Sequence, residues 1–303
     1  MPFQPQFRIT PLMLRQFKAI DDARGFLEAV RLRHDWSEDL HGVARVRDAL
    51  SSVQIEGNSL TFQEALALAR EAPDRELRDA ELEFLNYLRA FDAVDGLRDR
   101  RDVQLTGADL LNLHRKLVDG VRGGQRFAGK WRREEVQVGD RMGDQVVVHH
   151  QPPPWPEVEG HVADLLAWLE RVKVKPRRAQ VERGVVDDWL HPVLVAGIAQ
   201  HRLAWVHPFV DGNGRTARMF TTLLLYQRGY DFKCLFDLSS YYERNRDRYY
   251  EALRTVDRTG DYTDWLVYFM GGFALQMFTI KRLAAQHADG VQVPEVRAAT
   301  DEG

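Results

Sequence analysis

Apolar residues recur every three or four positions through the first third of the chain, between Leu12 and Leu97. Two clear examples are the sets Phe26, Leu27, Val30 and Leu82, Leu85, Leu88. This spacing places apolar side chains on one face of an α-helix. The sequence therefore predicts an all-helical N-terminal region.

Local signals mark where several of these helices begin and end. A helix through Val43–Val53 should stop at Glu56, because Gly57 readily takes the left-handed conformation that terminates helices. The pairs Thr61–Glu64 and Thr106–Asp109 have the spacing of capping boxes, in which two side chains bond to backbone N–H groups at a helix start. New helices are therefore expected after Thr61 and after Thr106.

The clearest alternation of apolar and polar residues lies between the helical segments. Val136–Val138 and Val146–Val148 flank the stretch Gly139–Asp144, a pattern typical of a β-hairpin with a long loop. Two strands alone are only marginally stable, so we expect the hairpin to pack on the helices.

The second half of the chain returns to helical patterns. Amphipathic spacing resumes in Val158–Leu169, the run Val193–Trp205 is almost wholly apolar, and another helix is expected over Thr216–Gln227. A helix that is apolar all round must be buried on every side. Because no internal repeat is found, the pattern predicts a mainly α fold: a helical bundle with one β-hairpin and an N-terminal helical region.

Composition excludes several classes of protein but does not indicate a function. The 303 residues are 44% apolar and 29% charged, with a mean hydropathy of −0.42, as in an ordinary globular protein rather than a disordered or membrane-embedded one. A net charge of −3 gives no long-range attraction to nucleic acid or anionic lipid. The single cysteine, Cys234, and the lack of a secretory signal pattern lead us to expect a cytoplasmic protein.

The chemistry is concentrated in the segment His207–Arg218, which reads His-Pro-Phe-Val-Asp-Gly-Asn-Gly-Arg-Thr-Ala-Arg. Gly212 and Gly214 permit a turn whose amides converge on an anion, and the following helix directs its positive dipole to the same point. Asn213 adds a side-chain donor. We interpret the segment as a phosphate-binding loop.

Charged residues around this loop extend the interpretation. Arg215 and Arg218 lie three residues apart, so both can reach phosphate oxygens from the first helical turn. Asp211 would repel phosphate unless a divalent cation lay between them, and Mg²⁺ is the usual cation. A neutral imidazole at His207 can accept a proton from an attacking hydroxyl, which makes His207 the candidate general base.

Every defined position of the Fic family signature, His-x-Phe-x-Asp/Glu-Gly-Asn-Gly-Arg-x-x-Arg, is present in this segment, which closely resembles it. A looser resemblance extends from about residue 20 to about residue 275. It implies the Fic fold and the transfer of AMP from ATP to a tyrosine, threonine or serine hydroxyl of a protein. Phosphate-transferring relatives carry lysine where Gly214 stands, so this residue favours AMP transfer.

The resemblance also implies roles for individual residues. His207 would deprotonate the target hydroxyl, Phe209 would anchor the loop in the core, and Asp211 would hold Mg²⁺ between the α- and β-phosphates. Backbone and side-chain donors at residues 212–214 would form an anion hole, and the two arginines would bind the β- and γ-phosphates. The ATP-binding set implied in this way is Phe209, Gly212, Asn213, Gly214, Arg215, Arg218, Tyr249 and Tyr250.

Two further segments are interpreted through the same resemblance. The hairpin at residues 134–150 matches the family's flap, which aligns the target segment by strand-like pairing. The pair Tyr249–Tyr250 matches tyrosines that line the adenine pocket, although by spacing alone it could equally pack in the core with Tyr241–Tyr242. Asp257 stands where some relatives have asparagine. The pair His149–His150 lacks a carboxylate or cysteine at ligand spacing, so we interpret both as surface histidines.

Ser52–Gly57 resembles the family's inhibitory motif, Ser/Thr-x-x-x-Glu-Gly/Asn. The resemblance implies that Glu56 pairs with Arg218 in the place of the γ-phosphate, while Ser52, one turn earlier, supports the contact by a hydrogen bond. Gly57 completes the motif. We therefore expect an enzyme that restrains its own activity.

Three functions are compatible with these patterns. The first is AMP transfer. The second is removal of AMP from modified protein by the same site, with Glu56 positioning water. The third is a non-catalytic nucleotide-binding or interaction module, against which the intact His207 and Asp211 argue.

The expected organisation is an N-terminal helical region over residues 1–104, a catalytic core over 105–283 and a polar tail over 284–303. The tail is too short for the DNA-binding module that often follows the core in relatives. Neither a membrane nor nucleic acid is expected as a partner. The target protein is not encoded in any pattern of residues. Modification of the protein's own hydroxyls and formation of a homodimer are expected only from the resemblance.

Overall fold

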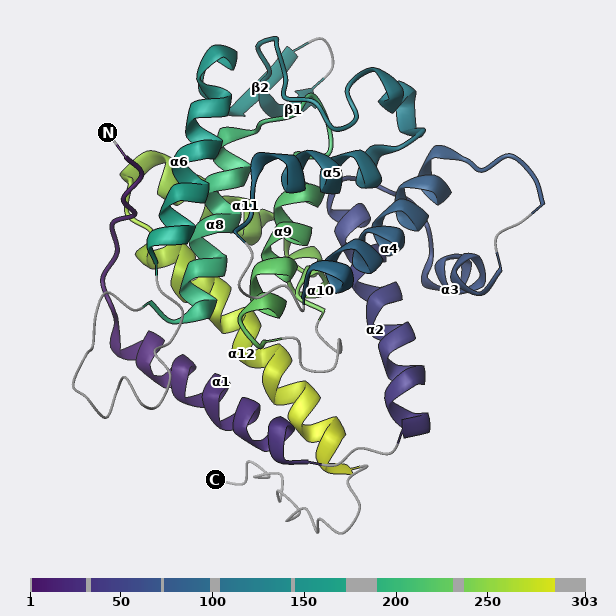
Figure 1. Cartoon of the computed structure of the whole chain (residues 1–303), viewed down its shortest axis with the longest axis vertical. Coiled ribbons are helices and arrows are strands. Elements are labelled where there is room, and N and C mark those ends of the chain that lie inside the picture. The colour runs from purple at the N-terminus through teal and green to yellow at the C-terminus, as the bar shows by residue number, and fades with distance from the viewer. Residues whose placement is uncertain are drawn as a thin grey trace.

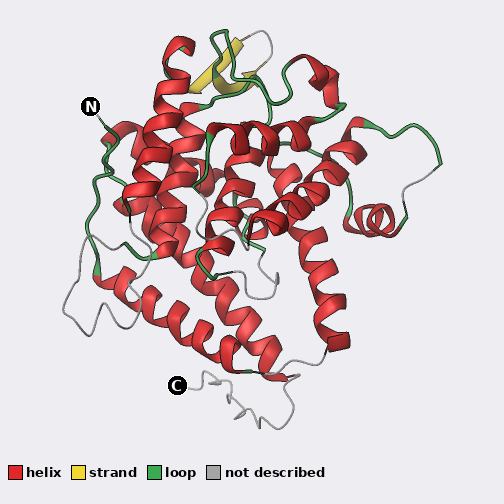
Figure 2. Ribbon diagram, in the orientation of Figure 1, coloured by secondary structure: helices red, strands yellow, loops and turns green. Residues whose placement is uncertain are grey.

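The computed structural model describes residues 2–30, 34–71, 74–98, 104–142, 145–172, 190–230 and 237–286; Cys234 and the tail beyond Gln286 lie outside these residues. The described parts are helical apart from one antiparallel hairpin and the connecting loops (Figure 2). The predicted mainly α fold class is therefore confirmed. Among the described helices, none combines the length and the apolar character that a membrane span requires.

Two consecutive helices, α8 (Pro192–Val206) and α9 (Asn213–Gln227), form the centre of the molecule (Figure 1). Helix α8 is buried on every side over its first ten residues, as its apolar sequence predicts. Trp265 of α12 (Thr263–Gln286) donates its indole N–H to the carbonyl of Gly197 at 2.7 Å, which fixes α12 against α8. The loop between α8 and α9 is thus held at both ends by buried helices.

Other helices enclose this central pair. Helix α1 (Pro11–Ala29) runs along α12 (Figure 1), and α6 (Val158–Arg171) packs on α8. Helices α4 (Asp79–Arg98) and α5 (Gly107–Val118) pack on α9. The hydrophobic core is one continuous cluster that draws on all of these helices.

The N-terminal helical region brings the end of α2 (His34–Ile55) close to the start of α9. Gly57 has a φ of +92°, and the helix ends at Ile55, one residue before the predicted end at Glu56. Both predicted capping boxes are present, at the starts of α3 (Phe62–Arg70) and α5. The short helix α10 (Ser239–Glu243) packs against α2.

The hairpin consists of β1 (Val138–Met142) and β2 (Gln145–His150). The strands are antiparallel, with Met142 opposite Gln145 and an irregularity after Val138. Residues 139–142 are therefore strand, whereas we predicted loop. The pairing uses backbone groups and does not require the apolar alternation on which the prediction relied.

Short elements complete the surroundings of the hairpin. The 3₁₀ turns η1 (Val121–Arg126) and η2 (Trp155–Glu157) precede and follow it, and helix α11 (Arg246–Thr259) packs against β2. Helix α9 begins at Asn213, three residues before the predicted start, because Asn213–Arg215 already take helical geometry.

Candidate functional site

His207 ends helix α8 in a left-handed conformation, with φ 49° and ψ 59°. Its backbone N–H donates to the carbonyl of Leu203, and its ring Nδ1 lies 3.3 Å from the carbonyl of Ala204. A carbonyl oxygen can only accept, so Nδ1 carries the proton. The Nε2 atom of this tautomer keeps its lone pair and can accept a proton.

The surroundings of His207 also keep its ring neutral. Burial lowers the pKa of His207 to about 4, the positive charge of His150 contributes in the same direction, and the hydrogen bond to Ala204 only partly opposes them. The imidazole is therefore unprotonated near neutral pH.

Phe209 fixes the loop in the core. Its ring is fully buried and stacks on the ring of His114 with a centroid distance of 3.7 Å and an interplanar angle of 4°. The side chain of Asn213 accepts a hydrogen bond from the backbone N–H of Phe209 and donates one to its carbonyl, both at 2.9 Å. Asn213 thus closes the loop on itself, and its side-chain amide is not directed to an anion as the sequence suggested.

His114 of helix α5, on which Phe209 stacks, also supports the loop through hydrogen bonds. Its Nε2 donates to the carbonyl of Asp211 at 2.9 Å, and its Nδ1 accepts from the backbone N–H of Gly129 at 3.0 Å. Protonation of Nδ1 would remove the second bond. Burial lowers the pKa of His114 to about 4, so the neutral ring is part of the folded structure.

We therefore expect acid to destabilise the protein through His114. A histidine whose pKa is about 6.5 when unfolded and about 4 when folded contributes stability above pH 6.5 that is lost as the pH falls towards 4. Between about pH 7.5 and about pH 5 the loss from this residue is about 2 kcal/mol. His114→Gln should lower the melting temperature at about pH 7.5 but reduce its further fall at about pH 5. An unchanged fall, measured by thermal unfolding, would contradict this role.

Two glycines lie at the start of α9, and the backbone conformation requires the first of them. Gly212 has a φ of +78°, and a Cβ there would lie 2.6 Å from Val118 Cγ1. A Cβ on Gly214 would overlap the carboxylate of Glu56. The first N–H groups of a helix have no partner within the helix, so this glycine-lined end is a site for a negatively charged group. In this structure the carboxylate of Glu56 lies there.

Arg218 joins the start of α9 to the end of α2. Its Nε donates to Ser52 Oγ, and its Nη2 donates to the carbonyl of Ser52 and to Glu56 Oε1, each at 2.8 Å. Burial would lower the pKa of Arg218, but the negative charge of Glu56 outweighs it and raises the pKa above its ordinary value. The side chain of Arg218 is 3% exposed and that of Glu56 is 35% exposed. The pair is therefore buried on the arginine side and open on the glutamate side.

Arg215 has different partners from Arg218. Its Nη2 lies 3.2 Å from Asp211 Oδ1, and its Nη1 lies 3.4 Å from Glu83 of α4. Asp211 Oδ1 also accepts from the backbone N–H of Gly212 at 2.6 Å. The side chain of Asp211 remains 37% exposed. The two arginines that the sequence places on one helix face thus serve different carboxylates.

Arg132 connects the loop to the hairpin. Its side chain is fully buried and donates to the carbonyls of His207 at 2.8 Å, Glu134 at 3.1 Å and Pro153 at 2.5 Å. Glu134 and Pro153 flank the hairpin, so one guanidinium group holds both ends of the hairpin and the peptide of His207 together. No sequence pattern distinguishes this residue, which lies in an ordinary basic stretch.

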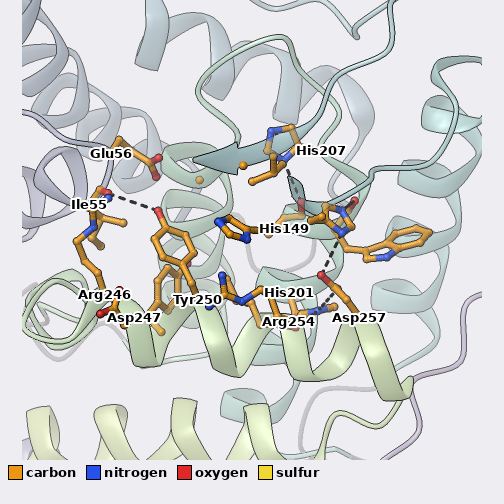
Figure 3. Close-up of a pocket in the computed structure, with 18 of the residues that line it drawn as sticks. Ile55, Glu56, His149, His201, His207, Arg246, Asp247, Tyr250, Arg254 and Asp257 are labelled. Atoms are coloured by element: carbon orange, nitrogen blue, oxygen red, sulfur yellow. Dashed lines mark hydrogen bonds and ion pairs between the residues drawn. The ribbon is translucent and has the colours of Figure 1, made fainter. Parts of the chain in front are cut away.

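A cavity of about 490 Å³ opens between the hairpin, the loop and helix α11. Figure 3 shows Glu56 and His207 facing it, with Tyr250, Arg254 and Asp257 projecting from α11 on another side. Tyr250 also lies 3.5 Å from the carbonyl of Ile55 through its hydroxyl, which joins α11 to the end of α2.

The cavity brings together only part of the predicted site. Its lining contains six of the predicted residues: Glu56, His207, Gly214, Arg218, Tyr249 and Tyr250. The remaining predicted residues lie beside it or support it: Ser52, Gly57, Phe209, Asp211, Gly212, Asn213 and Arg215. Tyr249 is also buried, stacks on Tyr242 and accepts a hydrogen bond from Gln200, so it packs in the core as well as lining the cavity.

The interpretation of His150 as a surface histidine is wrong. Its side chain is 11% exposed, and its Nδ1 lies 3.1 Å from Asp257 Oδ2. The other oxygen of Asp257 lies 3.1 Å from Nε2 of His201. The carboxylate partner of His150 is more than one hundred residues away in the chain, so a search at local ligand spacing could not find it.

Comparison with known sequences identifies the region that contains the site. The Fic/DOC family matches residues 104–225. Protein adenylyltransferase Fic of Drosophila melanogaster is 29% identical over 221 residues, which cover 71% of this chain and 39% of the relative. The Drosophila yakuba protein of the same name is 28% identical over 248 residues, covering 80% and 43%. The chain thus spans about two fifths of the length of these curated relatives.

Comparison with solved structures supports the fold. A Fic family protein from Desulfovibrio desulfuricans superposes with a TM-score of 0.75 at 23% identity, covering 97% of this chain and 79% of the other. A Fic domain containing signaling protein from Bacteroides thetaiotaomicron superposes with a TM-score of 0.68 at 18% identity, covering 92% and 99%. With the complete loop motif, these comparisons lead to one conclusion: residues 104–225 of this chain match the Fic/DOC family, and the described fold is similar to that of solved Fic proteins.

Proposed function

We propose that this protein transfers AMP from ATP to a hydroxyl group of a protein substrate. The observation that carries the proposal is the meeting of His207, in the tautomer with a free Nε2, with the glycine-lined start of α9 in one cavity. The names of the Drosophila relatives support the same activity. We further propose that residues 105–283 form the catalytic unit.

The groups in the cavity fit each part of such a reaction. The hydroxyl oxygen of the target attacks the α-phosphorus of ATP while its proton passes to Nε2 of His207. A P–O ester bond forms, the bond between the α-phosphorus and the bridging oxygen breaks, and pyrophosphate leaves with the electron pair. Backbone N–H groups at the start of α9, together with Arg218, stabilise the charge on the phosphate oxygens. Tyr249 and Tyr250 offer aromatic walls for the adenine.

Asp211 is the residue that fits a magnesium ion. Magnesium is usually bound by one or two carboxylates together with substrate phosphates. Asp211 is partly exposed at the start of α9, and hydrogen bonds occupy its Oδ1. Among the described residues no group of three or more acidic, histidine or cysteine side chains could hold a metal ion. The ion would neutralise phosphate charge and orient the leaving group.

We also propose that Glu56 inhibits the enzyme. Its carboxylate bonds to Arg218 and lies against Gly214, where an anionic phosphate group would otherwise be bound. Ser52 keeps Arg218 in the geometry that makes this contact. The carboxylate therefore competes with the terminal phosphate of ATP for the same donors.

Mass spectrometry tests the proposed transfer directly. The protein is incubated with ATP and Mg²⁺, alone and with a cell lysate, and tryptic peptides are searched for AMP adducts on tyrosine, threonine and serine. We expect adducts that depend on ATP and are absent when Asp211→Ala replaces the wild type. The incubation without lysate also reports self-modification. If no adduct forms even when Glu56 is replaced by glycine, the proposed function is wrong.

One observation favours a second activity of the same site, the removal of AMP from modified protein. Glu56 lines the cavity together with His207, so its partly exposed carboxylate can position a water molecule there. Incubation of an AMP-modified peptide with Mg²⁺ but without ATP distinguishes the two. Release of AMP that is lost in Glu56→Gly would identify a hydrolase, and no release would leave transfer alone.

A further inference from the structure

The C-terminal end of strand β2 is attached to the helical body by charged side chains. His150, the last residue of β2, lies between Asp257 of α11 and the backbone carbonyl of Trp205 at the end of α8. Helix α11 packs on β2 at this point. Figure 3 shows Asp257 on α11 with its interactions drawn towards the hairpin and towards His201.

The partners of His150 require its ring to be a cation. Nδ1 lies 3.1 Å from Asp257 Oδ2, and Nε2 lies 2.8 Å from the carbonyl of Trp205. Both partners can only accept hydrogen bonds, so both ring nitrogens must carry protons to satisfy them. Burial would lower the pKa of His150, but the bonds to Asp257 and Trp205 outweigh it and raise the pKa.

The second histidine fixes the carboxylate rather than the hairpin. Nε2 of His201 lies 3.1 Å from Asp257 Oδ1 and 3.2 Å from the carbonyl of Leu253, so this nitrogen is the donor. Nδ1 lies 3.3 Å from the hydroxyl of Tyr262, from which it can accept. Burial would raise the pKa of Asp257, but the bonds from His150 and His201 outweigh it and hold the pKa below its usual range. Asp257 is therefore a fixed anion that faces the hairpin.

These contacts lie beside the proposed reaction centre. His150 and Asp257 line the same cavity as His207, and the hairpin contributes Val138 and Gly139 to its wall. The position of β2 on α11 therefore sets the width of the cavity between the hairpin and the helix. Arg132 holds the two ends of the hairpin. The contact through His150 fixes the last residue of β2 on the side of the cavity that is lined by Tyr249 and Tyr250.

We propose that His150 and Asp257 form a charged latch that holds strand β2 on helix α11 and so positions the target segment at His207. The proposal rests on the proposed AMP transfer, because only in that reaction does a target segment have to be positioned at His207. Both residues are positioning residues: neither needs to touch the reacting atoms.

Hydrogen–deuterium exchange tests the latch without ATP or a target. Asp257→Asn and His150→Gln should each increase the corrected exchange of the amides of residues 145–150 by about tenfold, the usual weight of a partly buried charge-assisted hydrogen bond. The double variant should exchange no faster than either single variant. Asp257→Glu, which keeps the charge, should restore most of the protection. Asp264→Asn, which removes an exposed carboxylate from the first turn of the neighbouring helix α12, is the matched control and should leave the hairpin unchanged.

The pH dependence distinguishes a charged latch from simple packing. His150 must be protonated, so hairpin protection in the wild type is full below pH 6.5 and decreases as the pH rises through its raised pKa. The charged and titratable groups beside the latch are His149 of β2, Arg254 and Arg258 of α11, and His201 and His207 at the C-terminal end of α8. Asp257→Asn should abolish the pH dependence. The same pH dependence in wild type and variant, or equal increases in exchange across α8 and α11, would overturn the proposal.

A kinetic measurement tests the consequence for the target. With the modified peptide found by mass spectrometry as acceptor, Asp257→Asn should raise the KM for that peptide about tenfold. Both kcat and the KM for ATP should stay within about twofold. A lower kcat with an unchanged peptide KM would overturn the positioning role. If no transfer occurs at all, the proposed function fails, while the exchange result still decides whether the latch exists.

Discussion

Replacing Glu56 by glycine is expected to increase AMP incorporation by about 10- to 100-fold, the range that corresponds to the loss of one hydrogen bond between charged groups. The carboxylate of Glu56 lies on Gly214 and bonds to Arg218, so its removal frees both for a phosphate group. Arg218 keeps its two bonds to Ser52 and should retain its position. The measurement is the initial rate of AMP incorporation from labelled ATP.

A matched variant separates this effect from a general loosening of the N-terminal region. Glu71 ends helix α3, is exposed and, like Glu56, is a glutamate next to a helix terminus. Glu71→Gly should leave the rate within about twofold, since surface substitutions rarely have large effects. If Glu56→Gly and Glu71→Gly behave alike, the inhibitory role of Glu56 is excluded.

Replacing His207 by alanine should abolish transfer while leaving ATP binding nearly intact. A positioned general base contributes about 10²- to 10⁴-fold to a rate, so a fall of at least about 100-fold is expected. The variant is made in the Glu56→Gly background, in which the starting rate is high. ATP affinity, measured by calorimetry with Mg²⁺, should change by less than about twofold, because the phosphate donors lie on α9 and not on the imidazole.

The control for this variant is another histidine of the helical body. His161 lies on α6, pairs with Glu157 and does not line the cavity. His161→Ala should therefore keep the transfer rate. Transfer by His207→Ala at more than about one tenth of the starting rate would show that another group accepts the proton.

Features with a local cause could be predicted from the sequence. Three such features are the two capping boxes, the end of α2 just before Gly57 and the burial of α8. Each depends on residues within a few positions of one another. The loop between α8 and α9 is local too, because its glycines and arginines follow one another in the chain. Such patterns can be interpreted from one segment of the sequence, because all the residues that determine the structure lie within that segment.

Features with partners far apart in the chain could not be predicted in this way. Arg132 bonds to carbonyls at both ends of the hairpin and at His207, and backbone carbonyls carry no sequence signal. His150, Asp257 and His201 meet only because the hairpin, α11 and α8 fold together. The orientation of Asn213 into its own loop depends on geometry that the letters Gly-Asn-Gly do not specify.

The attachment of the hairpin through Arg132 has a consequence for how this protein can change over evolutionary time. The guanidinium group grips main-chain oxygens at Glu134 and Pro153, and every amino acid supplies such oxygens. Substitutions in the intervening stretch therefore leave the anchoring of His207 intact. The hairpin sequence can therefore diverge at positions other than His150 while the peptide of His207 stays in place.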